Sequence, residues 1–369
     1  MPADLSGASA LLKRDTTIRT LSVTNRTPDL KGMLLSELEE LVSELGQPRY
    51  RADQMVGWLF TKGIQDISEM KNLSKALKES LASRASVTRS KVVRAKRSAI
   101  DDTEKLLLEY TDGSRIEAVT LTDDERHTGC ISTQVGCRFR CRFCATGAMG
   151  FKRNLSPGEI VEQILQLQKR LDPVRLNNLV FMGMGEPLDN YDALLKAIRI
   201  ANAPWGLSIG ARRMTVSTAG VVPGIRRLAD EGLQINLAVS LNAPTQELRA
   251  HLMPIARKYP LNELMDALKH YAQTVGRLVT IEYVLMKGVN DSPEMATMLG
   301  RLASGMLAKI NVICYNEVKG ARYKAPDNET FTDFITSLRR QCPTVVRRIS
   351  RGSDIAAGCG QLCVLPDTE

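Results

Sequence analysis

Cys137-Arg-Phe-Arg-Cys141-Arg-Phe-Cys144 is the stretch that decides how this chain is interpreted. Three cysteines occur at CxxxCxxC spacing in a basic segment with glycines on either side. A structural zinc site takes four ligands, and no fourth cysteine or histidine stands at zinc-ligand spacing beside these three. A cubane iron–sulfur cluster takes one thiolate for each iron, so three cysteines leave one iron open. The spacing therefore favours a [4Fe–4S] cluster over a half zinc site or a run of core cysteines.

The same spacing resembles the motif of radical S-adenosylmethionine (SAM) enzymes, whose open iron chelates the amino and carboxylate groups of SAM. A second candidate contact is Gly183-Met-Gly185-Glu186-Pro187, which directly follows a predicted buried strand. Glycine permits close approach of the backbone to a ligand, and the Glu186 carboxylate can accept hydrogen bonds from the ammonium group of SAM. At successive predicted strand ends we expect a ring of ribose and carboxylate contacts from Ser217, Ser240 and Asn316.

Strand-like runs alternate with helical runs through the second half of the chain. This βα alternation predicts an α/β fold with a parallel sheet and right-handed crossovers. In barrels of this kind the chemistry lies at the carboxyl ends of the strands, where the polar candidates fall. The predicted strands cover residues 177–183, 213–218, 235–241, 278–286 and 309–315.

The amino-terminal part has a different pattern. Apolar residues recur at helical spacing over 34–45, from Pro48 onwards and near 72–84, which predicts a small helical unit that could bind RNA. The period then changes to two, and Asp112-Gly113 predicts a hairpin turn. We predict a basic tail (1–27), a helical accessory domain (28–85), an antiparallel β meander (86–125), a catalytic core (126–350) and a carboxyl-terminal tail (351–369).

Composition limits the partners and the compartment. The formal net charge of +9 over 369 residues favours a polyanionic partner. One basic strip before and within the meander is either a solvated face or a phosphate track, formed by Arg84, Arg89, Lys91, Arg94, Lys96 and Arg97. Eight cysteines are too few for a disulfide scaffold, which favours a reducing compartment. No apolar run reaches membrane-spanning length and no secretory signal is evident, so we predict a cytoplasmic protein.

Two cysteines outside the triplet have suggestive surroundings. Cys359 lies between Gly358 and Gly360, which predicts a flexible, exposed thiol. Cys130 stands seven residues before Cys137. The alternative is that both are unrelated free cysteines, which is the interpretation we give to Cys314, Cys342 and Cys363.

Several longer motifs together resemble one family. CISTQVGCRFRCRFCATGAMGFKRNL, VFMGMGEPLDNY, TVSTAGVVPGI, IEYVLMKGVND and RGSDIAAGCGQL occur in order between about residues 100 and 363 and look like the RlmN family of radical SAM RNA methyltransferases. The resemblance implies a partial (β/α)6 TIM-like barrel with a small helical domain and a short antiparallel extension. It also implies methylation of C2 of an adenosine in the peptidyl-transferase region of 23S rRNA, and of the adenosine 3′ of the anticodon in tRNA.

The resemblance also implies a role for each matching residue. The cluster ligands would be Cys137, Cys141 and Cys144, and Cys359 would carry the methyl group as S-methylcysteine, with two SAM molecules consumed per turnover. Cys130 would be the disulfide partner that releases the product, and Glu117 the acceptor of the C2 proton. The positions that match SAM contacts are Gly185, Glu186, Ser217, Ser240, Leu241, Asn242 and Asn316.

Two positions depart from the family pattern. Asn242 replaces a usual histidine, and Tyr315-Asn316-Glu317 replaces Trp-Asn-Pro. Asparagine still forms hydrogen bonds but does not titrate, so the contact at Asn242 survives if it is structural.

The expected partners are the two RNAs and an electron donor such as flavodoxin, and the expected state is a monomer. Alternatives left open are C8 methylation of the same adenosine, a non-catalytic iron–sulfur protein that binds RNA, and a zinc-stabilised RNA-binding module. Candidates for gripping RNA phosphates near the site are Arg138, Arg140, Arg142, Lys152, Arg153, Arg347, Arg348 and Arg351.

Overall fold

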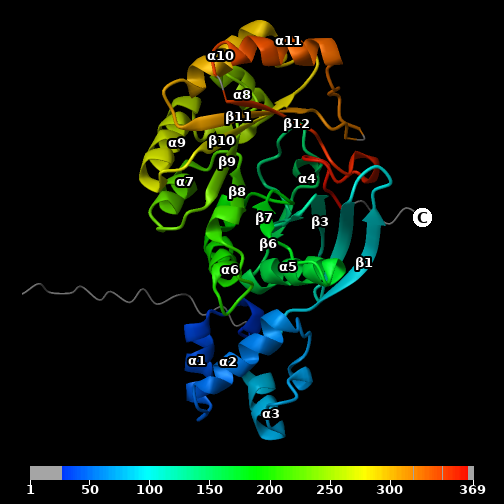
Figure 1. Cartoon of the computed structure of the whole chain (residues 1–369), viewed down its shortest axis with the longest axis vertical. Helices are drawn as coiled ribbons and strands as arrows, with labels where there is room; N and C mark the ends of the chain where they lie inside the picture. Colours follow the sequence, from blue (N-terminus) through cyan, green and yellow to red (C-terminus); the bar gives the residue numbers. More distant parts are fainter. Residues whose placement is uncertain (1–26, 319, 343, 365–369) are drawn as a thin grey trace, which may run out of the picture.

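The computed structural model describes residues 27–318, 320–342 and 344–364, and a ten-stranded sheet runs through this part of the chain (Figure 1). Its order is β1-β2-β3-β4-β7-β8-β9-β10-β11-β12. The strands are β1 Ser90–Arg97, β2 Thr103–Tyr110, β3 Arg115–Asp123, β4 Arg126–Cys130, β7 Asn178–Phe181, β8 Met214–Thr218, β9 Asn236–Ser240, β10 Val279–Leu285, β11 Ala308–Cys314 and β12 Val345–Arg348.

The sheet has an antiparallel part and a parallel part. Strands β1 to β4 pair antiparallel, whereas β4 to β12 are parallel neighbours. The five predicted parallel strands are present as β7 to β11. The sequence analysis missed β4 as the first parallel strand and β12 as the last, because both are short and β4 carries polar residues such as Arg126 and His127.

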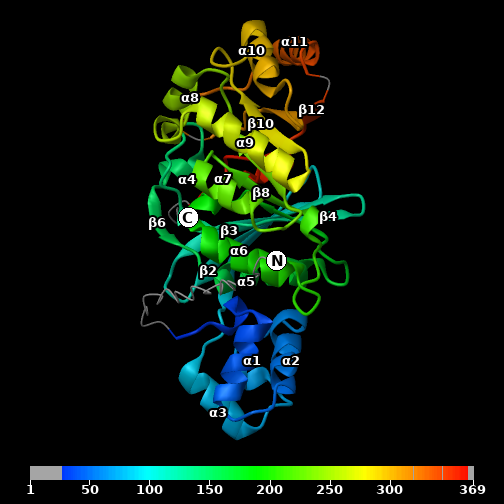
Figure 2. The same cartoon turned by 90° about the vertical axis from the view of Figure 1, so that its left-hand side faces the viewer.

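Helices join successive parallel strands and cover the sheet (Figures 1 and 2). The first of these, α5, begins where predicted: the Ser156 hydroxyl accepts from the Glu159 amide at 3.1 Å, and the Glu159 carboxylate accepts from the Ser156 amide at 2.8 Å. The helices are α5 Pro157–Leu171, α6 Tyr191–Asn202, α7 Val222–Ala229, α8 Gln246–Leu252, α9 Leu261–Val275, α10 Pro293–Ala303 and α11 Asn328–Arg339.

A small helical unit occupies one end of the molecule, drawn in blue in Figures 1 and 2. It contains α1 Leu35–Glu44, α2 Tyr50–Val56 with a π-helical continuation Gly57–Thr61, and α3 Lys75–Arg84. Leu38, Met55 and Leu81 are fully buried in it, as the helical spacing requires. The predicted basic tail lies, apart from Thr27, outside the described residues.

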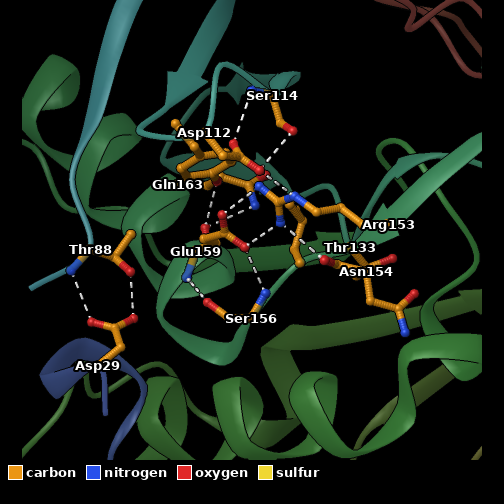
Figure 3. Close-up of polar contacts among 12 residues, drawn as sticks. Asp29, Thr88, Asp112, Ser114, Thr133, Arg153, Asn154, Ser156, Glu159 and Gln163 are labelled. Atoms are coloured by element: carbon orange, nitrogen blue, oxygen red, sulfur yellow. Dashed lines mark hydrogen bonds and ion pairs between the residues drawn. The ribbon is translucent and has the colours of Figure 1, made fainter. Parts of the chain in front are cut away.

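The helical unit is attached to α5 by a buried polar network. The 3-10 turn η1 Leu30–Gly32 places the Lys31 ammonium on the Glu162 carboxylate, and Ser90 donates to the same carboxylate at 2.9 Å. Asp29 accepts from the Thr88 amide at 2.9 Å and from its hydroxyl at 2.5 Å (Figure 3). A buried charge that lost its partner would be costly, so these contacts fix how the unit sits on the core.

The meander β1–β3 holds the carboxyl-terminal segment, which lies beside it in Figure 1. Ser98 donates to Asp354 at 2.8 Å, Lys105 donates to the Ala356 carbonyl at 2.9 Å, and Arg351 donates to the Thr122 carbonyl at 2.7 Å. The predicted meander is therefore more than a linker, because it continues the main sheet and anchors the segment that carries Cys359. Among the described helices, none combines the length and apolar character needed to span a bilayer.

Candidate active site

A cavity of 160 Å³ lies at the carboxyl ends of the parallel strands. It brings together candidates that are far apart in the sequence, including the cysteine triplet and the thiol near the carboxyl end. The sequence-predicted residues that line it are Cys137, Cys141, Cys144, Gly185, Glu186, Ser217, Ser240, Asn242 and Cys359. Glu117, Cys130, Leu241 and Asn316 do not line it.

A short β-ribbon closes the loop that carries the three cysteines. Strand β5 Gln134–Gly136 pairs with β6 Phe151–Asn154, and the Cys137 amide donates to the Gly150 carbonyl at 2.8 Å. Gly136 has φ of 76°, and a Cβ there would lie 1.8 Å from the Gly150 oxygen, so only glycine fits at the base of the loop. The ribbon thus fixes the cysteine loop at the cavity.

The three thiols are suited to a cluster only as thiolates. Burial raises the pKa of Cys137 to about 12 and raises that of Cys141 well above its ordinary value, so binding of iron must displace protons from them. Among the described residues, no three His, Cys, Asp or Glu side chains are arranged as ligands of one metal ion. A cluster in which each thiolate binds its own iron needs three cysteines and leaves one iron open, whereas a structural zinc site takes four ligands.

Arg249 of α8 supports the same assignment. Its side chain is fully buried, and Nη2 donates to the Ala219 carbonyl at 2.6 Å. Nε and Nη1 have no partner among the described residues, and burial lowers the pKa of Arg249 to about 10. The guanidinium interacts electrostatically with Cys141, so negative charge from cluster thiolates would compensate its burial. Sequence analysis missed this residue because only the fold brings it beside the cysteines.

Glu186 follows β7 and lines the cavity. Its carboxylate accepts from the Leu188 amide at 3.1 Å and from the Ala219 amide at 2.7 Å. Burial nevertheless raises the pKa of Glu186 to about 7. Gly185 has φ of 101°, and a Cβ there would lie 2.5 Å from the Gln134 side chain, which explains the glycine before the acid. A cationic ligand group would favour the ionised carboxylate.

Asn242 has a structural role. Its φ is 59°, a left-handed conformation that asparagine tolerates better than most residues. Its Oδ1 accepts from the Val284 amide at 2.9 Å, and its carbonyl accepts from Asn290 at 2.8 Å. The side chain therefore ties β9 to β10, so the hydrogen bond that asparagine provides at this position is structural.

The two outlying thiols lie near each other but in different surroundings. Cys359 is exposed and lines the cavity, and its carbonyl accepts from Asn316 at 3.1 Å. Cys130 is buried at the end of β4, where burial first and the charge of Cys359 second raise its pKa to about 12. Both are free thiols in this structure, so the disulfide implied by the resemblance is absent from this state.

Glu117 lies on β3 outside the cavity. Its carboxylate pairs with Lys105 at 2.9 Å and accepts from the Cys363 amide at 3.0 Å. Burial raises its pKa, and the positive charge of Lys105 opposes that shift. Glu117 is thus in contact with the segment that carries Cys359, although it does not face the cavity.

Glu282 and Arg348 line the cavity, and sequence analysis missed the first and treated the second as a phosphate contact. Glu282 Oε1 accepts from Asn311 at 3.0 Å and pairs with Arg348 at 3.5 Å, whereas Oε2 has no partner among the described residues. Burial raises the pKa of Glu282. A glutamate inside an apolar strand, Ile281-Glu-Tyr-Val-Leu285, was the signal that could have revealed it.

We expect Glu282→Leu to lower the free energy of unfolding by roughly 1–3 kcal/mol, because Arg348 and Asn311 would lose a buried acceptor. Glu282→Gln keeps an acceptor oxygen for both donors, so it should lower the free energy of unfolding by less than Glu282→Leu does. Thermal unfolding followed by circular dichroism measures both variants, and equal midpoints for Glu282→Leu and the wild type would contradict the role assigned to this carboxylate.

Comparison with known proteins agrees with this geometry. Residues 131–299 match the radical SAM superfamily, and residues 28–87 match the ribosomal RNA large subunit methyltransferase N-terminal domain. A crystal structure of a radical SAM methyltransferase from Sphaerobacter thermophilus has a TM-score of 0.87 and 43% identity, covering 91% of this chain and 99% of that one.

Curated relatives match almost the whole chain. A probable dual-specificity RNA methyltransferase RlmN of Geobacillus thermodenitrificans is 46% identical over 338 residues, which is 91% of this chain and 92% of that protein. The dual-specificity RNA methyltransferase RlmN of Syntrophus aciditrophicus is 44% identical over 335 residues, 90% of this chain and 96% of that protein.

The fold and the three-cysteine cavity define a radical SAM enzyme, a SAM-dependent RNA methyltransferase whose cofactors are a [4Fe–4S] cluster and SAM. Within that class, the chain belongs to the RlmN family. The family resemblance is confirmed, and membership of an enzyme family overturns the alternatives of a non-catalytic iron–sulfur protein and a zinc-stabilised binding module.

Proposed function

We propose that this protein methylates C2 of an adenosine in 23S rRNA and of the adenosine 3′ of the anticodon in tRNA, through S-methylcysteine at Cys359. The observation that carries the proposal is that the exposed Cys359 thiol lines the same cavity as Cys137, Cys141 and Cys144. A thiol that receives a methyl group and then presents it to RNA needs this placement.

The first task of the chain is to hold the cofactors. In this proposal the three loop cysteines bind the cluster, which supplies one-electron reduction of SAM when bound. The Glu186 carboxylate receives the SAM ammonium group, and the short side chains Ser217 and Ser240 face the rest of the molecule. The strand ends are shaped by Leu241, Asn242 and Asn316. Of these three residues, only Asn242 also lines the cavity.

The second task is to join and then release the RNA. C2 of adenine is electron-poor and carries a hydrogen that is not acidic, so a route through a carbon bound to Cys359 replaces direct polar transfer. Glu117 accepts the C2 proton, which requires the contact between its carboxylate and the Cys363 amide to rearrange. The Cys130 thiolate then attacks the Cys359 sulfur, and a disulfide forms between them. The electron pair of the breaking sulfur–carbon bond passes to the carbon on the RNA, which takes up a proton and becomes the methyl group.

This release step should accelerate with pH. Because burial holds the pKa of Cys130 well above its ordinary value, its thiolate is a small fraction near pH 7, and that fraction grows about tenfold for each rise of one pH unit. The expected result is release of RNA from Cys359 that is about tenfold faster at pH 8.5 than at pH 7.5. Rapid-quench electrophoresis of single turnovers measures it, and a rate that is flat over this range would contradict attack by Cys130.

The remaining parts of the chain serve the substrate in this proposal. The helical unit and the exposed outer strand β1 bind RNA. The RNA presents the target base from a single-stranded loop. The enzyme is a monomer, and a protein such as flavodoxin supplies its electrons.

The decisive experiment is mass spectrometry of rRNA and tRNA from a strain that lacks the gene, before and after complementation. Loss and return of 2-methyladenosine in both RNAs is the expected result. Return of 8-methyladenosine would support the C8 alternative instead, and unchanged RNA would refute both.

A further inference from the structure

The arginines that the sequence analysis proposed as phosphate contacts differ in whether they form ion pairs within the protein. Several are already paired with carboxylates: Arg138 with Asp189 at 2.8 Å, and Arg153 with Asp112 at 2.7 Å and Glu159 at 2.8 Å (Figure 3). Arg351 pairs with Asp123 at 2.6 Å, and Arg348 with Glu282. The charge of each of these guanidinium groups is balanced within the protein, which weakens its attraction for an external phosphate.

Arg142 has different surroundings. Its Nη1 lies 3.3 Å from Nε2 of His251, and Nη2 of Arg322 lies 3.0 Å from the same nitrogen. All three side chains are exposed. Neither guanidinium forms an ion pair with a carboxylate of the described residues. One imidazole nitrogen offers a single lone pair, so two positively charged groups converge on an acceptor that satisfies at most one of their donors.

The imidazole in the middle is neutral near pH 7. The charge of Arg142 lowers the pKa of His251 most, and Arg322 and Arg257 lower it further. The cluster of Arg142, His251 and Arg322 therefore carries two positive charges on exposed side chains, with the Tyr323 hydroxyl 3.5 Å from Nη2 of Arg322 as a further, long contact. Two exposed guanidinium groups suit a compact anion with several acceptor oxygens.

The cluster is fixed at the rim of the active-site cavity. The Arg142 amide donates to the Leu252 carbonyl at 2.9 Å, which ties the cysteine loop to the end of α8. Arg322 precedes Tyr323, whose buried ring packs edge-on against Tyr315 at 6.1 Å between centroids. Tyr315 and Phe143 line the cavity. A phosphate held by the cluster would therefore lie next to residues that line the cavity.

We propose that Arg142, His251 and Arg322 form a binding site for one phosphate of the RNA backbone next to the target adenosine. The phosphate oxygens accept the guanidinium N–H groups that His251 leaves unsatisfied, and this contact positions the nucleotide over the cavity. The inference deepens the proposed function and rests on it for the identity of the adenosine.

The test is equilibrium binding of holoenzyme to a stem-loop RNA in the absence of turnover. Uncharged methylphosphonates replace single phosphates on either side of the target adenosine. For the wild type, one such replacement should weaken binding about tenfold. The double variant Arg142→Gln/Arg322→Gln should bind unmodified RNA about tenfold more weakly than the wild type does. In this variant the same methylphosphonate should lower the affinity by less than about twofold. Its slope of log affinity against log salt should be smaller by about 0.7.

A matched control removes two charges elsewhere. Arg212 and Arg213 are exposed in the turn that leads into the amino end of β8, whereas the cavity lies at the carboxyl ends of the parallel strands. Arg212→Gln/Arg213→Gln should keep the full effect of the methylphosphonate. Because Arg142 lies between two cluster cysteines, Arg322→Gln alone, matched to the wild type for iron content, provides the same comparison without disturbing the loop.

Two results would overturn the inference. The first is a loss of affinity in the double variant that is no larger than in the control. The second is a methylphosphonate that weakens binding of the double variant as much as it weakens binding of the wild type. Neither depends on which carbon is methylated, since binding is read without turnover. Conversely, product identity by mass spectrometry tests the proposed function whether or not this phosphate site exists.

Discussion

Cys130→Ala is expected to accumulate a covalent protein–RNA species, whereas Cys359→Ala is expected to form none. With Cys359 removed there is no thiol to receive the methyl group, so neither adduct nor product can arise. With Cys130 removed the earlier steps remain possible, but the thiol exchange that frees the RNA does not. Both variants should lose at least about 1000-fold in product formation, because each removes a nucleophile rather than a contact.

Denaturing electrophoresis of each expressed variant, with and without nuclease, measures the difference. A shifted, nuclease-sensitive band for Cys130→Ala alone is the expected result. Cys314→Ala, which removes a partly exposed thiol of β11, is the control and should turn over normally. Equal adducts in both variants, or none in either, would contradict the assigned roles.

Cys141→Ala is expected to lose the iron–sulfur cluster and all product formation. Three thiolates around one cavity are the whole cysteine ligand set in this proposal, and two cannot hold four irons when one iron must stay open. The loss should be complete within detection, whereas substitution of a contact to SAM would only weaken binding.

Iron and sulfide analysis of anaerobically reconstituted protein, with its absorption spectrum, provides the measurement. Cys314→Ala again serves as the control, because it leaves the cysteine loop intact. Full iron and sulfide content in Cys141→Ala would show that the cluster assignment is wrong. Circular dichroism of the same sample excludes loss of fold as the cause of a lost cluster.

The meander is in contact with two parts of the proposed catalytic machinery. Lys105 of β2 holds the Ala356 carbonyl and the Glu117 carboxylate, so a single side chain connects the proposed base to the segment that carries Cys359. Lys105 lies outside the basic strip of the sequence analysis, so that strip did not predict these internal contacts. Alternation of exposed basic residues along β1 cannot distinguish a solvated face from a phosphate track, since both leave the same pattern.

The sequence alone determined the local features. The spacing of the cysteines in the chain sets the CxxxCxxC ligand pattern. Ser156 and Pro157 set the start of α5, and the apolar runs set β7 to β11. Each of these features depends only on residues that are neighbours in the chain. The family could also be predicted, since its motifs are contiguous. These features needed no knowledge of which strand pairs with which.

Only the tertiary structure decided which distant side chains meet. Arg249 beside Cys141, Glu282 beside Arg348, and His251 between Arg142 and Arg322 are contacts across strands and helices, and no local pattern encodes them. The structure also separated residues that the sequence analysis had predicted to belong to one site. Cys359 lines the cavity, whereas Glu117 and Asn316 do not. The physical reason is that burial and pairing, which determine the charge and reach of a side chain, arise only when the sheet brings its strand ends together.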